Sequence, residues 1–495
     1  MNGSSIENID KMKIPMKTSV AAVVLLAGTA LGGAAHAACS PDYEGVTLTA
    51  VSQTGPFIAS ALRMAGDTWE EKTCGELNIV EIPFGELYPK YITGLTTGSV
   101  DFDIMTYAPA WLGDFAAYLS EMPESYRTSK GWLDIAPVYR DRLMVWNDKV
   151  ISQSMDGDVH TLQYRLDLFN DSTEQAAFKE KYGYELAPPA TWDQYYDIAE
   201  FFTRPDDNLW GTAEAMVRGG QQFWFFFSHA ASYTNDPDEQ GGMFFDPKTM
   251  DARINNPGWV KALEDYIKTV AVSPPGATGF SSGDIRTAFS GGKVAMNFDW
   301  GDTGTVATDP DQSSVAGNVG SALLPGSTEI WSASEHKWKS YETPVQSPFM
   351  AFGGWQAGVP ESSNQKEAAW NFVAHLTNAE NSIKQAVTGG TGVNPYRTSH
   401  FDVSKWTDLM TDVEAESYLA AQQGSIEAEN VALDMRLPGY FSYTEILEIE
   451  LSKALAGQVS PQEALDQIAE EWDRLTDDFG RESQLAAYRA SMGIE

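Results

Sequence analysis

Apolar positions recur with two different periods over the first part of the chain. Three short runs of apolar and β-branched residues predict buried strands, namely Val46–Val51, Leu77–Ile82 and Asp101–Met105. The stretches between them, Phe57–Glu71 and Leu87–Thr97, repeat apolar residues at helical spacing. The order β-α-β-α-β predicts a parallel sheet whose strands are joined by right-handed crossovers.

A more informative pattern begins near residue 349. Phe349–Phe352 has the apolar character of a strand, and Gly353–Gly354 interrupts it with a backbone that can turn sharply. Trp355 follows the two glycines directly. Asn364 and Glu367 then have the spacing of a capping box, which predicts the start of a helix. We therefore expect a strand, an aromatic turn and a helix in this order.

The middle of the chain combines extended and helical patterns. Arg142–Trp146 and Val159–Phe169 are predicted to be extended. Thr191 and Gln194 have the spacing of a capping box, and apolar residues at helical spacing follow them. Phe223–Phe227 consists of aromatic residues, and we expect most of these rings to lie in a core.

The C-terminal part is predicted to be helical. Ser460 and Glu463 form a capping box, with Pro461 in the first turn. Apolar residues then recur at helical spacing, at Leu465, Ile468, Trp472 and Leu475. Such a stripe predicts a helix that buries one face against the rest of the protein.

Composition and charge narrow the classes of function. The chain has 495 residues and a formal net charge of −36, which argues against nucleic-acid binding because that function needs a basic surface. Its length is sufficient for more than one domain. An acidic protein suits a neutral or a cationic ligand, and the net charge does not choose between them.

Residues 1–37 are predicted to be a secretory signal peptide. A basic segment precedes an apolar core over Val20–Leu31, and Ala35–Ala37 has the small-residue pattern of a cleavage site. Met12 and Met16 are alternative translation starts within this segment. No later run is long and apolar enough to predict a transmembrane helix, so we expect an exported, periplasmic protein.

The two cysteines, Cys39 and Cys74, would then lie in an oxidising compartment. Each precedes a predicted strand, so both lie at the same sheet edge if these strands are parallel neighbours, and we expect a disulfide between them. Lipidation of Cys39 is disfavoured, because His36 occupies a position where a lipidation signal needs an aliphatic residue. Two cysteines alone do not indicate a metal site, and the histidines have no metal-ligand spacing.

Several of these motifs occur together in one family. Three segments resemble the family 1 extracellular solute-binding proteins. They are the turn at Gly353–Trp355 with its following helix, the run Tyr88–Asp103, and the Pro-Pro-Ala-Thr-Trp-Asp run at Pro188–Asp193. These are the sugar-binding subunits of bacterial ABC importers. The resemblance implies an α/β, two-lobe periplasmic binding protein fold of type II, in which discontinuous lobes are joined by crossing strands.

The resemblance also implies how the chain is divided between the lobes. The first lobe is expected to comprise residues 38–160 and 291–350. The second lobe is expected to comprise residues 161–290 and 351–495, the last of which includes the C-terminal helices. A hinge between the lobes would close them around a ligand.

The resemblance places the ligand between the lobes and implies no catalytic group, cofactor or metal. Trp355 is the leading candidate for ligand contact, because an aromatic ring beside exposed peptide groups suits a sugar ring. The alternative is that Trp355 is a buried scaffold residue. The predicted ligand-binding residues are Gln53, Thr54, Asp103, Tyr107, Trp111, Trp224, Asp299, Trp300, Gly353, Gly354, Trp355 and Arg397.

The implied function is capture of a carbohydrate or polyol in the periplasm by a monomer that delivers it to the permease subunits of an ABC transporter. Two alternatives stay open: a binding protein for a non-sugar solute such as a polyamine or peptide, and an exported carbohydrate-active enzyme. Gly279–Gly283 matches the nucleophile motif of serine hydrolases. No strand pattern precedes it, which disfavours Ser281 as a nucleophile.

Overall fold

The computed structural model describes residues 39–219 and 221–494, so the predicted signal peptide over residues 1–37 lies outside the described residues. The strands are β1 (Thr47–Gln53), β2 (Glu76–Ile82), β3 (Ile104–Tyr107), β4 (Val145–Trp146), β5 (Lys149–Val150), β6 (Gln153–Ser154), β7 (His160–Arg165), β8 (Met296–Trp300), β9 (Val319–Ala322), β10 (Ser327–Ser332), β11 (Lys337–Val345), β12 (Phe349–Met350), β13 (Gln356–Gly358) and β14 (Ala432–Leu433).

The α-helices are α1 (Ala59–Thr73), α2 (Phe84–Thr97), α3 (Leu112–Phe115), α4 (Glu124–Arg127), α5 (Lys130–Leu133), α6 (Leu166–Phe169), α7 (Ser172–Tyr182), α8 (Trp192–Phe202), α9 (Gln222–Thr234), α10 (Pro257–Lys268), α11 (Ser282–Ser290), α12 (Asp302–Thr308), α13 (Lys366–Leu376), α14 (Ala379–Ala386), α15 (Asp412–Ile426), α16 (Tyr440–Leu455), α17 (Pro461–Phe479) and α18 (Arg481–Met492). A π-helix, η4, spans Val138–Leu143.

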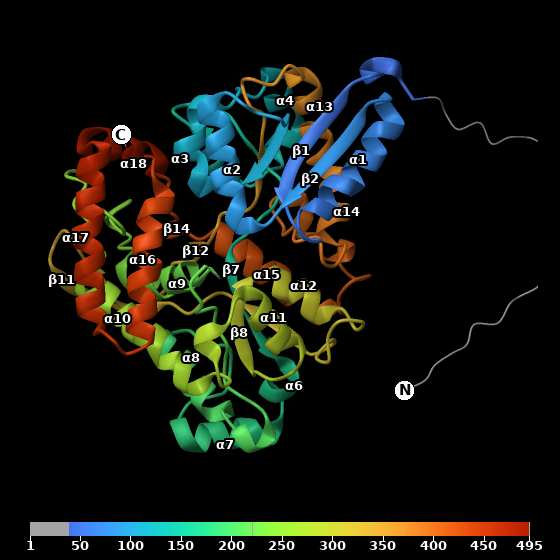
Figure 1. Ribbon diagram of the computed structural model, residues 1–495. Coiled ribbons are helices and arrows are strands. Elements are labelled where there is room, and N and C mark those ends of the chain that lie inside the picture. Colours follow the sequence, from blue (N-terminus) through green and yellow to red (C-terminus); the bar gives the residue numbers. More distant parts are fainter. Residues whose placement is uncertain (1–38, 220, 495) are drawn as a thin grey trace, which may run out of the picture. The chain divides into compact units, whose positions relative to one another are not determined.

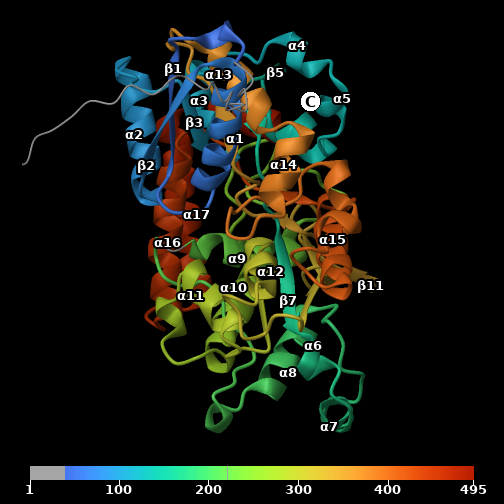
Figure 2. The same cartoon turned by 90° about the vertical axis from the view of Figure 1, so that its right-hand side faces the viewer.

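The first sheet has the strand order β2-β1-β3-β13-β6. β1 runs parallel to both β2 and β3, with α1 and α2 as the connecting helices, so the predicted β-α-β-α-β order is confirmed. Figures 1 and 2 show α13 and α14 beside α1, next to this sheet. Helices that cover a parallel sheet bury its apolar strands and leave its strand ends free for a site.

The second sheet has the order β8-β7-β9, with both pairs antiparallel. The aromatic run Phe223–Phe227 lies in α9, and all five side chains are buried in the core beside this sheet. The expectation of a core role for these rings is therefore confirmed. α9 packs against α10, which begins with the side chain of Asn256 as its N-cap.

Strand pairing corrects two of the expected lobe assignments. β8 belongs to residues 291–350, which were expected in the first lobe, but it pairs with β7 of the second sheet. β13 belongs to residues 351–495, which were expected in the second lobe, but it pairs with β3 and β6 of the first sheet. Both pairings join residues far apart in sequence, and local patterns carry no information about such partners. The remaining boundaries stay predictions.

Local expectations need correction at three places. Residues 142 and 143, predicted to be extended, close the π-helix η4. The predicted extended run Val159–Phe169 is a strand only as far as Arg165, because α6 begins at Leu166. Asn364 does not cap α13, since the N-cap is Gln365, whose N–H donates to Ser363 Oγ at 3.0 Å.

The predicted caps of two other helices are confirmed. Thr191 Oγ1 accepts a hydrogen bond from Gln194 N at 3.3 Å at the start of α8. Ser460 and Glu463 form the reciprocal capping box of α17, with Pro461 at its first position. These contacts satisfy backbone N–H groups that have no partner within a helix. α17 then packs against both α16 and α18, and Figure 1 shows α16 and α17 side by side.

The predicted disulfide between Cys39 and Cys74 is present, with a Cα–Cα distance of 5.4 Å. Cys74 ends α1 in the left-handed conformation, two residues before β2 begins. Because β1 and β2 are parallel neighbours, the chain segments before both strands meet at one edge of the sheet. The parallel pairing of β1 and β2 therefore brings the two cysteines together, as predicted.

Candidate ligand-binding site

A cavity of about 300 Å³ is lined by residues from both sheets, at the positions where several strands end. Gln53 is the last residue of β1, and Trp300 is the last residue of β8. Phe84 begins α2, directly after β2 and Pro83. Open α/β sheets bind ligands outside the carboxyl ends of their strands, so this cavity is the candidate ligand site.

An aromatic wall forms one side of the lining, made of Phe57, Phe84, Trp300, Phe352 and Trp355. The ring centroids of Phe352 and Trp355 are 4.9 Å apart, and those of Phe84 and Trp355 are 6.1 Å apart with the rings edge to face. The rings of Phe84, Phe352 and Trp355 therefore support one another. Their faces suit the carbon skeleton of a sugar or a polyol.

A strained turn presents Phe352 and Trp355 to the cavity. Phe352, Gly353 and Gly354 have consecutive positive φ angles of 64°, 78° and 81°. A Cβ atom at Gly354 would lie 2.2 Å from the backbone oxygen of Asp156, so only glycine fits there. A bulky residue such as Phe352 rarely adopts this conformation, and such strain persists where the surroundings hold it, often at functional sites.

The polar end of the cavity is organised around Arg286 of α11. Its Nε donates to Asp299 Oδ2 at 2.5 Å, and its Nη2 donates to Asp302 Oδ2 at 2.9 Å. The guanidinium carbon lies 5.4 Å from the ring centroid of Phe57 and 5.9 Å from that of Trp300. Burial opposes the charge, but Asp299 and Asp302 outweigh burial and raise the pKa of Arg286. The guanidinium is therefore charged and held in place.

Asp156 and Asp158 lie in the segment that joins β6 of the first sheet to β7 of the second. Asp156 accepts hydrogen bonds from the backbone N–H of Asn394 at 2.7 Å and of Trp355 at 3.2 Å. Asp158, which lines the cavity, accepts from Asn394 Nδ2 at 2.9 Å. The pair therefore connects the crossing segment to the turn that carries Trp355.

Burial changes the protonation of this acidic pair. Burial and the nearby Asp302 raise the pKa of Asp156 to about 7. Burial and the charges of Asp156 and Asp302 raise the pKa of Asp158 well above its usual value. Burial also raises the pKa of Asp302. Burial thus favours a protonated form of the pair, which reduces its negative charge.

Six of the twelve predicted ligand-binding residues either line this cavity or hold the residues that line it in place. The residues that line it are Gln53, Trp300 and Trp355. The residues that support it are Gly353, Gly354 and Asp299. Trp355 is only 6 % exposed, so its ring is both part of the packed wall and part of the lining.

The structure places the other predicted residues outside the lining. These are Thr54, Asp103, Tyr107, Trp111, Trp224 and Arg397. Asp103 instead accepts hydrogen bonds from Thr49 N and Ser363 Oγ, just before β3 begins and away from its carboxyl end. Arg397 is 3 % exposed and donates to the backbone oxygens of residues 131 and 377. Ligand contact by any of the predicted residues stays a prediction.

Twelve residues that line the cavity were not among the predicted ligand-binding residues, and they include Phe57, Phe84, Asp158, Arg286 and Asp302. Phe57 and Phe84 lie close after the ends of β1 and β2, and this position after a strand is a signal that could have found them. Asp158 belongs to an Asp-Gly-Asp run that has the composition of an ordinary turn. Arg286 and Asp302 carried no local signal, because their pairing depends on the fold.

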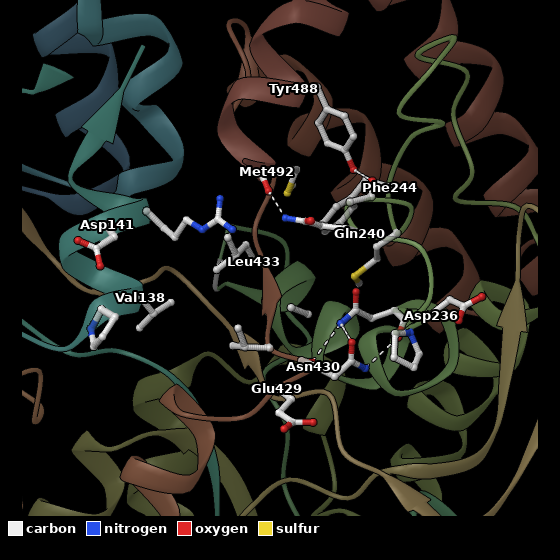
Figure 3. A pocket seen from close by; sticks show the side chains of 18 residues that line it. Val138, Asp141, Asp236, Gln240, Phe244, Glu429, Asn430, Leu433, Tyr488 and Met492 are labelled. Atoms are coloured by element: carbon white, nitrogen blue, oxygen red, sulfur yellow. Dashed lines mark hydrogen bonds between the residues drawn. The ribbon is translucent and has the colours of Figure 1, made fainter. Parts of the chain in front are cut away.

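A second cavity of about 540 Å³ lies beside β14 and is drawn in Figure 3. Three of the polar side chains that line it are hydrogen-bonded to neighbouring protein groups. Asn235 Nδ2 donates to Asn430 Oδ1 at 3.1 Å, Gln240 Nε2 donates to the backbone oxygen of Met492 at 2.9 Å, and Tyr488 donates to Gly241. The first cavity has the aromatic wall and the buried acidic pair, so it remains the candidate site.

Ser281, the central residue of the hydrolase-like motif, begins a helix instead. Its Oγ donates to Asp284 Oδ2 at 2.7 Å, and its backbone N–H donates to the same oxygen at 2.9 Å, which is the capping box of α11. Within residues 39–219 and 221–494, no group of three His, Cys, Asp or Glu side chains is arranged to hold a metal ion. None of the helices in the described part of the chain is both long and apolar enough to cross a membrane.

Two sheets joined by crossing segments, with a lined cavity at their strand ends, define a two-lobe binding protein of the periplasmic type. The chain belongs to the bacterial extracellular solute-binding proteins, whose family model matches residues 54–383. The family and fold are those of proteins that bind solutes for ABC transport.

Known proteins with similar sequences or folds belong to the same class. A probable amino-acid ABC transporter periplasmic-binding protein from Sinorhizobium fredii is 24% identical over 362 residues, which cover 72% of this chain and 74% of that protein. An ABC transporter solute-binding protein from Agrobacterium radiobacter K84, solved with ribitol, is 25% identical with a TM-score of 0.69 and covers 87% of this chain and 99% of its own. Maltose-bound MalE3 from T. maritima has the same fold, at 21% identity and a TM-score of 0.68, covering 87% and 100% of the two chains.

Proposed function

We propose that the protein captures a carbohydrate or polyol between its lobes in the periplasm and, as a monomer, delivers it to the permease subunits of an ABC transporter. The observation that carries this proposal is one cavity with an aromatic wall and a polar end that contains the guanidinium of Arg286 and the carboxyl groups of Asp158 and Asp302. A polyhydroxy molecule has matching features, because its hydroxyl groups donate and accept while its carbon skeleton lies on aromatic rings. The likeness to the ribitol complex supports the same class of ligand.

The size of the cavity favours a small ligand. Its volume of about 300 Å³ is at the lower end of the range for ligand pockets. A single sugar unit or a short polyol suits this volume better than a long oligosaccharide does. Micromolar affinity requires about 8 kcal/mol, which a few stacked rings and hydrogen bonds can supply.

A cationic ligand such as a polyamine is less well matched. The carboxyl groups of Asp156, Asp158 and Asp302 have raised pKa values, and the charge of Arg286 lies at the same end of the cavity. Protonated carboxyl groups and a guanidinium reduce the attraction for a cation. A carbohydrate-active enzyme would require a pair of carboxyl groups placed to act on a glycosidic bond, and here Asp299 and Asp302 are both bonded to Arg286.

A thermal-shift screen of the mature protein tests the proposal. Sugars and polyols, including ribitol, D-mannitol, tagatose and maltose, are compared with polyamines, peptides and amino acids at equal concentrations. We expect at least one sugar or polyol to raise the melting temperature, because a ligand that binds only the folded state stabilises it by mass action. Stabilisation by polyamines, peptides or amino acids alone would contradict the proposal.

A further inference from the structure

Trp224 lies behind the aromatic wall of the cavity. It belongs to α9, is 2 % exposed and does not line the cavity. Its ring meets Trp300 edge to face at a centroid distance of 5.8 Å and Phe352 at 5.3 Å. Close-packed rings transmit displacement to their neighbours, so the orientation of this one indole affects two of the five aromatic side chains in the wall.

A single carboxyl group holds the polar atom of this indole. Trp224 Nε1 donates to Asp434 Oδ2 at 2.8 Å. The same oxygen accepts a hydrogen bond from the hydroxyl of Tyr440 at 2.9 Å. An indole has one hydrogen-bonding atom, so this contact fixes the rotation of the ring in its own plane. Asp434 is itself 6 % exposed and therefore has little freedom to move.

The backbone around Asp434 is tied to the strand that leads into the wall. Asp434 directly follows β14, and β14 pairs in parallel with β12, which ends two residues before Phe352. Arg436 donates to the backbone oxygens of Arg142 at 3.0 Å and Ser491 at 2.7 Å. Asp434 is thus anchored by a strand on one side and by a buried arginine on the other.

Phe352 needs such support because its backbone has a positive φ of 64°. A non-glycine residue in this conformation carries strain that the surrounding structure must hold. The ring of Phe352 contacts Phe84 and Trp355, which line the cavity, and Trp224, which does not. Trp224 is therefore the aromatic contact that supports Phe352 from behind.

We propose that Asp434 is a positioning residue for the ligand site: by holding the Trp224 indole, it keeps Trp300 and Phe352 in the orientation that a ligand meets. The inference rests on the proposed function where it concerns ligand affinity. Where it concerns the arrangement of the rings, it can be tested without a ligand.

The ring arrangement is tested by ¹⁹F NMR of protein labelled with 5-fluorotryptophan. The signals of Trp224 and Trp300 are assigned with the variants Trp224→Phe and Trp300→Phe. We expect Asp434→Ala to move or broaden the Trp300 signal, because the indole behind it loses its acceptor. Asp434→Asn keeps an oxygen acceptor of the same shape, so we expect a Trp300 signal close to that of the wild type.

A matched control removes an indole acceptor elsewhere. Trp69 Nε1 donates to Asn371 Oδ1 at 2.9 Å, beside α1 and α13 and away from the cavity lining. Asn371→Ala removes a comparable hydrogen bond, and we expect it to leave the Trp300 signal in place. A shift in Asn371→Ala as large as in Asp434→Ala would show that the signal reports general loosening, and the inference would be overturned.

Affinity is then measured by calorimetry with whichever of ribitol, D-mannitol, tagatose or maltose binds the wild type. We expect Asp434→Ala to weaken binding by at least about tenfold, while Asp434→Asn and Asn371→Ala stay within about threefold of the wild type. If Asp434→Ala does not fold, Trp224→Phe replaces it, because phenylalanine keeps most of the ring and removes the N–H donor.

The outcomes separate the inference from the proposed function. If none of the four solutes binds the wild type, the proposed function is contradicted for them, and the Trp300 signal alone decides the positioning role. An unchanged Trp300 signal in a folded Asp434→Ala or Trp224→Phe variant overturns the inference. So does a failure of Asp434→Asn to restore the signal or the affinity.

Discussion

Buried carboxyl groups outnumber the guanidinium at the polar end of the cavity. Asp156, Asp158, Asp299 and Asp302 are each at most 8 % exposed, and the cation that contacts Asp299 and Asp302 is Arg286. Burying like charges together is costly, so part of the charge is removed by protonation, as the raised pKa values of Asp156 and Asp158 show. The cavity therefore has hydrogen-bond donors and acceptors without a large net charge.

This protonation predicts the effect of Asp158→Asn on stability. The folded-state pKa values of Asp156 and Asp158 lie above their usual value, so the folded protein binds protons that the unfolded chain has lost. The contribution of Asp156 to stability is complete below about pH 4 and is lost as the pH rises through about 7. The contribution of Asp158 is likewise present below its usual pKa and is lost as the pH rises towards its raised folded-state pKa. Asp158→Asn removes one carboxyl group and keeps an acceptor for Asn394. We expect the unfolding free energy of the variant, relative to wild type, to increase between pH 5 and pH 8.

Urea unfolding at several pH values measures this difference. Asp148→Asn, at an exposed hairpin turn between β4 and β5, removes the same formal charge and serves as the control. We expect its unfolding free energy to run parallel to that of the wild type. Parallel curves for Asp158→Asn as well would contradict the assignment of a proton to the buried pair.

Trp355→Ala tests the aromatic wall. The ring is 6 % exposed, lines the cavity and contacts Phe84 and Phe352. We expect a loss of about 1–3 kcal/mol of binding free energy, as for other aromatic hot spots. We also expect a loss of about 3–5 kcal/mol of unfolding free energy, because the ring is packed. Calorimetry with the ligand found in the screen and a denaturant melt of the empty protein measure the two effects.

Trp472→Ala is the control for the loss of a buried tryptophan. Trp472 is fully buried in α17, and its Nε1 donates to Tyr443, away from the cavity lining. We expect a similar loss of stability with unchanged affinity in the folded fraction. If Trp355→Ala behaves in the same way, Trp355 is scaffold and its place in the ligand site is wrong.

Among the elements, the turn between β12 and β13 determines where the wall residues lie. Gly354 has a φ of 81°, and a Cβ there would lie 2.2 Å from the Asp156 backbone oxygen, which side-chain rotation cannot relieve. Gly390 has nearly the same φ, 80°, but open space around its would-be Cβ. The two glycines therefore separate the cost of the clash from the cost of the backbone conformation.

We expect Gly390→Ala to lower the unfolding free energy by about 1–2 kcal/mol, the cost of a left-handed conformation for a residue with a Cβ. Gly354→Ala is expected to lower it by clearly more, because the crossing segment at Asp156 must also move. Denaturant melts of the two variants measure both quantities. Equal losses would mean that Gly354 is needed for its backbone conformation but not for the close approach of the two segments.

The disulfide constrains β1 and α1. Cys39 and Cys74 are 35 residues apart, and cross-links over loops of this length stabilise proteins by about 2–4 kcal/mol, mainly by restricting the unfolded chain. We expect the double variant Cys39→Ser, Cys74→Ser to lose about this amount in denaturant melts. Wild-type protein treated with reductant should match it, and an unreduced wild type with two titratable thiols would contradict the bond.

For the whole molecule, the two sheets and the cavity between them predict closure on binding. Residues from both sheets line the cavity, so a ligand that contacts both favours the arrangement in which they are close. We expect small-angle X-ray scattering to give a smaller radius of gyration at saturation with the ligand. A solute that gives no thermal shift is the control, and an unchanged radius with confirmed binding would contradict closure.

Much of the local structure could be predicted from short sequence patterns and from the order of neighbouring strands. Rules on periodicity, capping and strand order were sufficient for four features. These are the first parallel strands, the caps of α8 and α17, the glycine turn before Trp355 and the pairing of Cys39 with Cys74. These rules work because backbone hydrogen bonding and side-chain spacing are decided by near neighbours. The family resemblance also pointed to Gln53, Trp300 and Trp355, each of which lines the cavity.

The composition of the site depended on burial and on how the elements pack in three dimensions. Arg286 meets Asp299 and Asp302 because α11 packs beside β8 and α12, and β8 joined the sheet of β7 rather than the one expected. Asp156 and Asp158 acquire their raised pKa values only when a crossing segment is buried against Asn394. A pattern read along the chain contains neither burial nor the identity of a partner hundreds of residues away, and desolvation and Coulomb interaction depend on both.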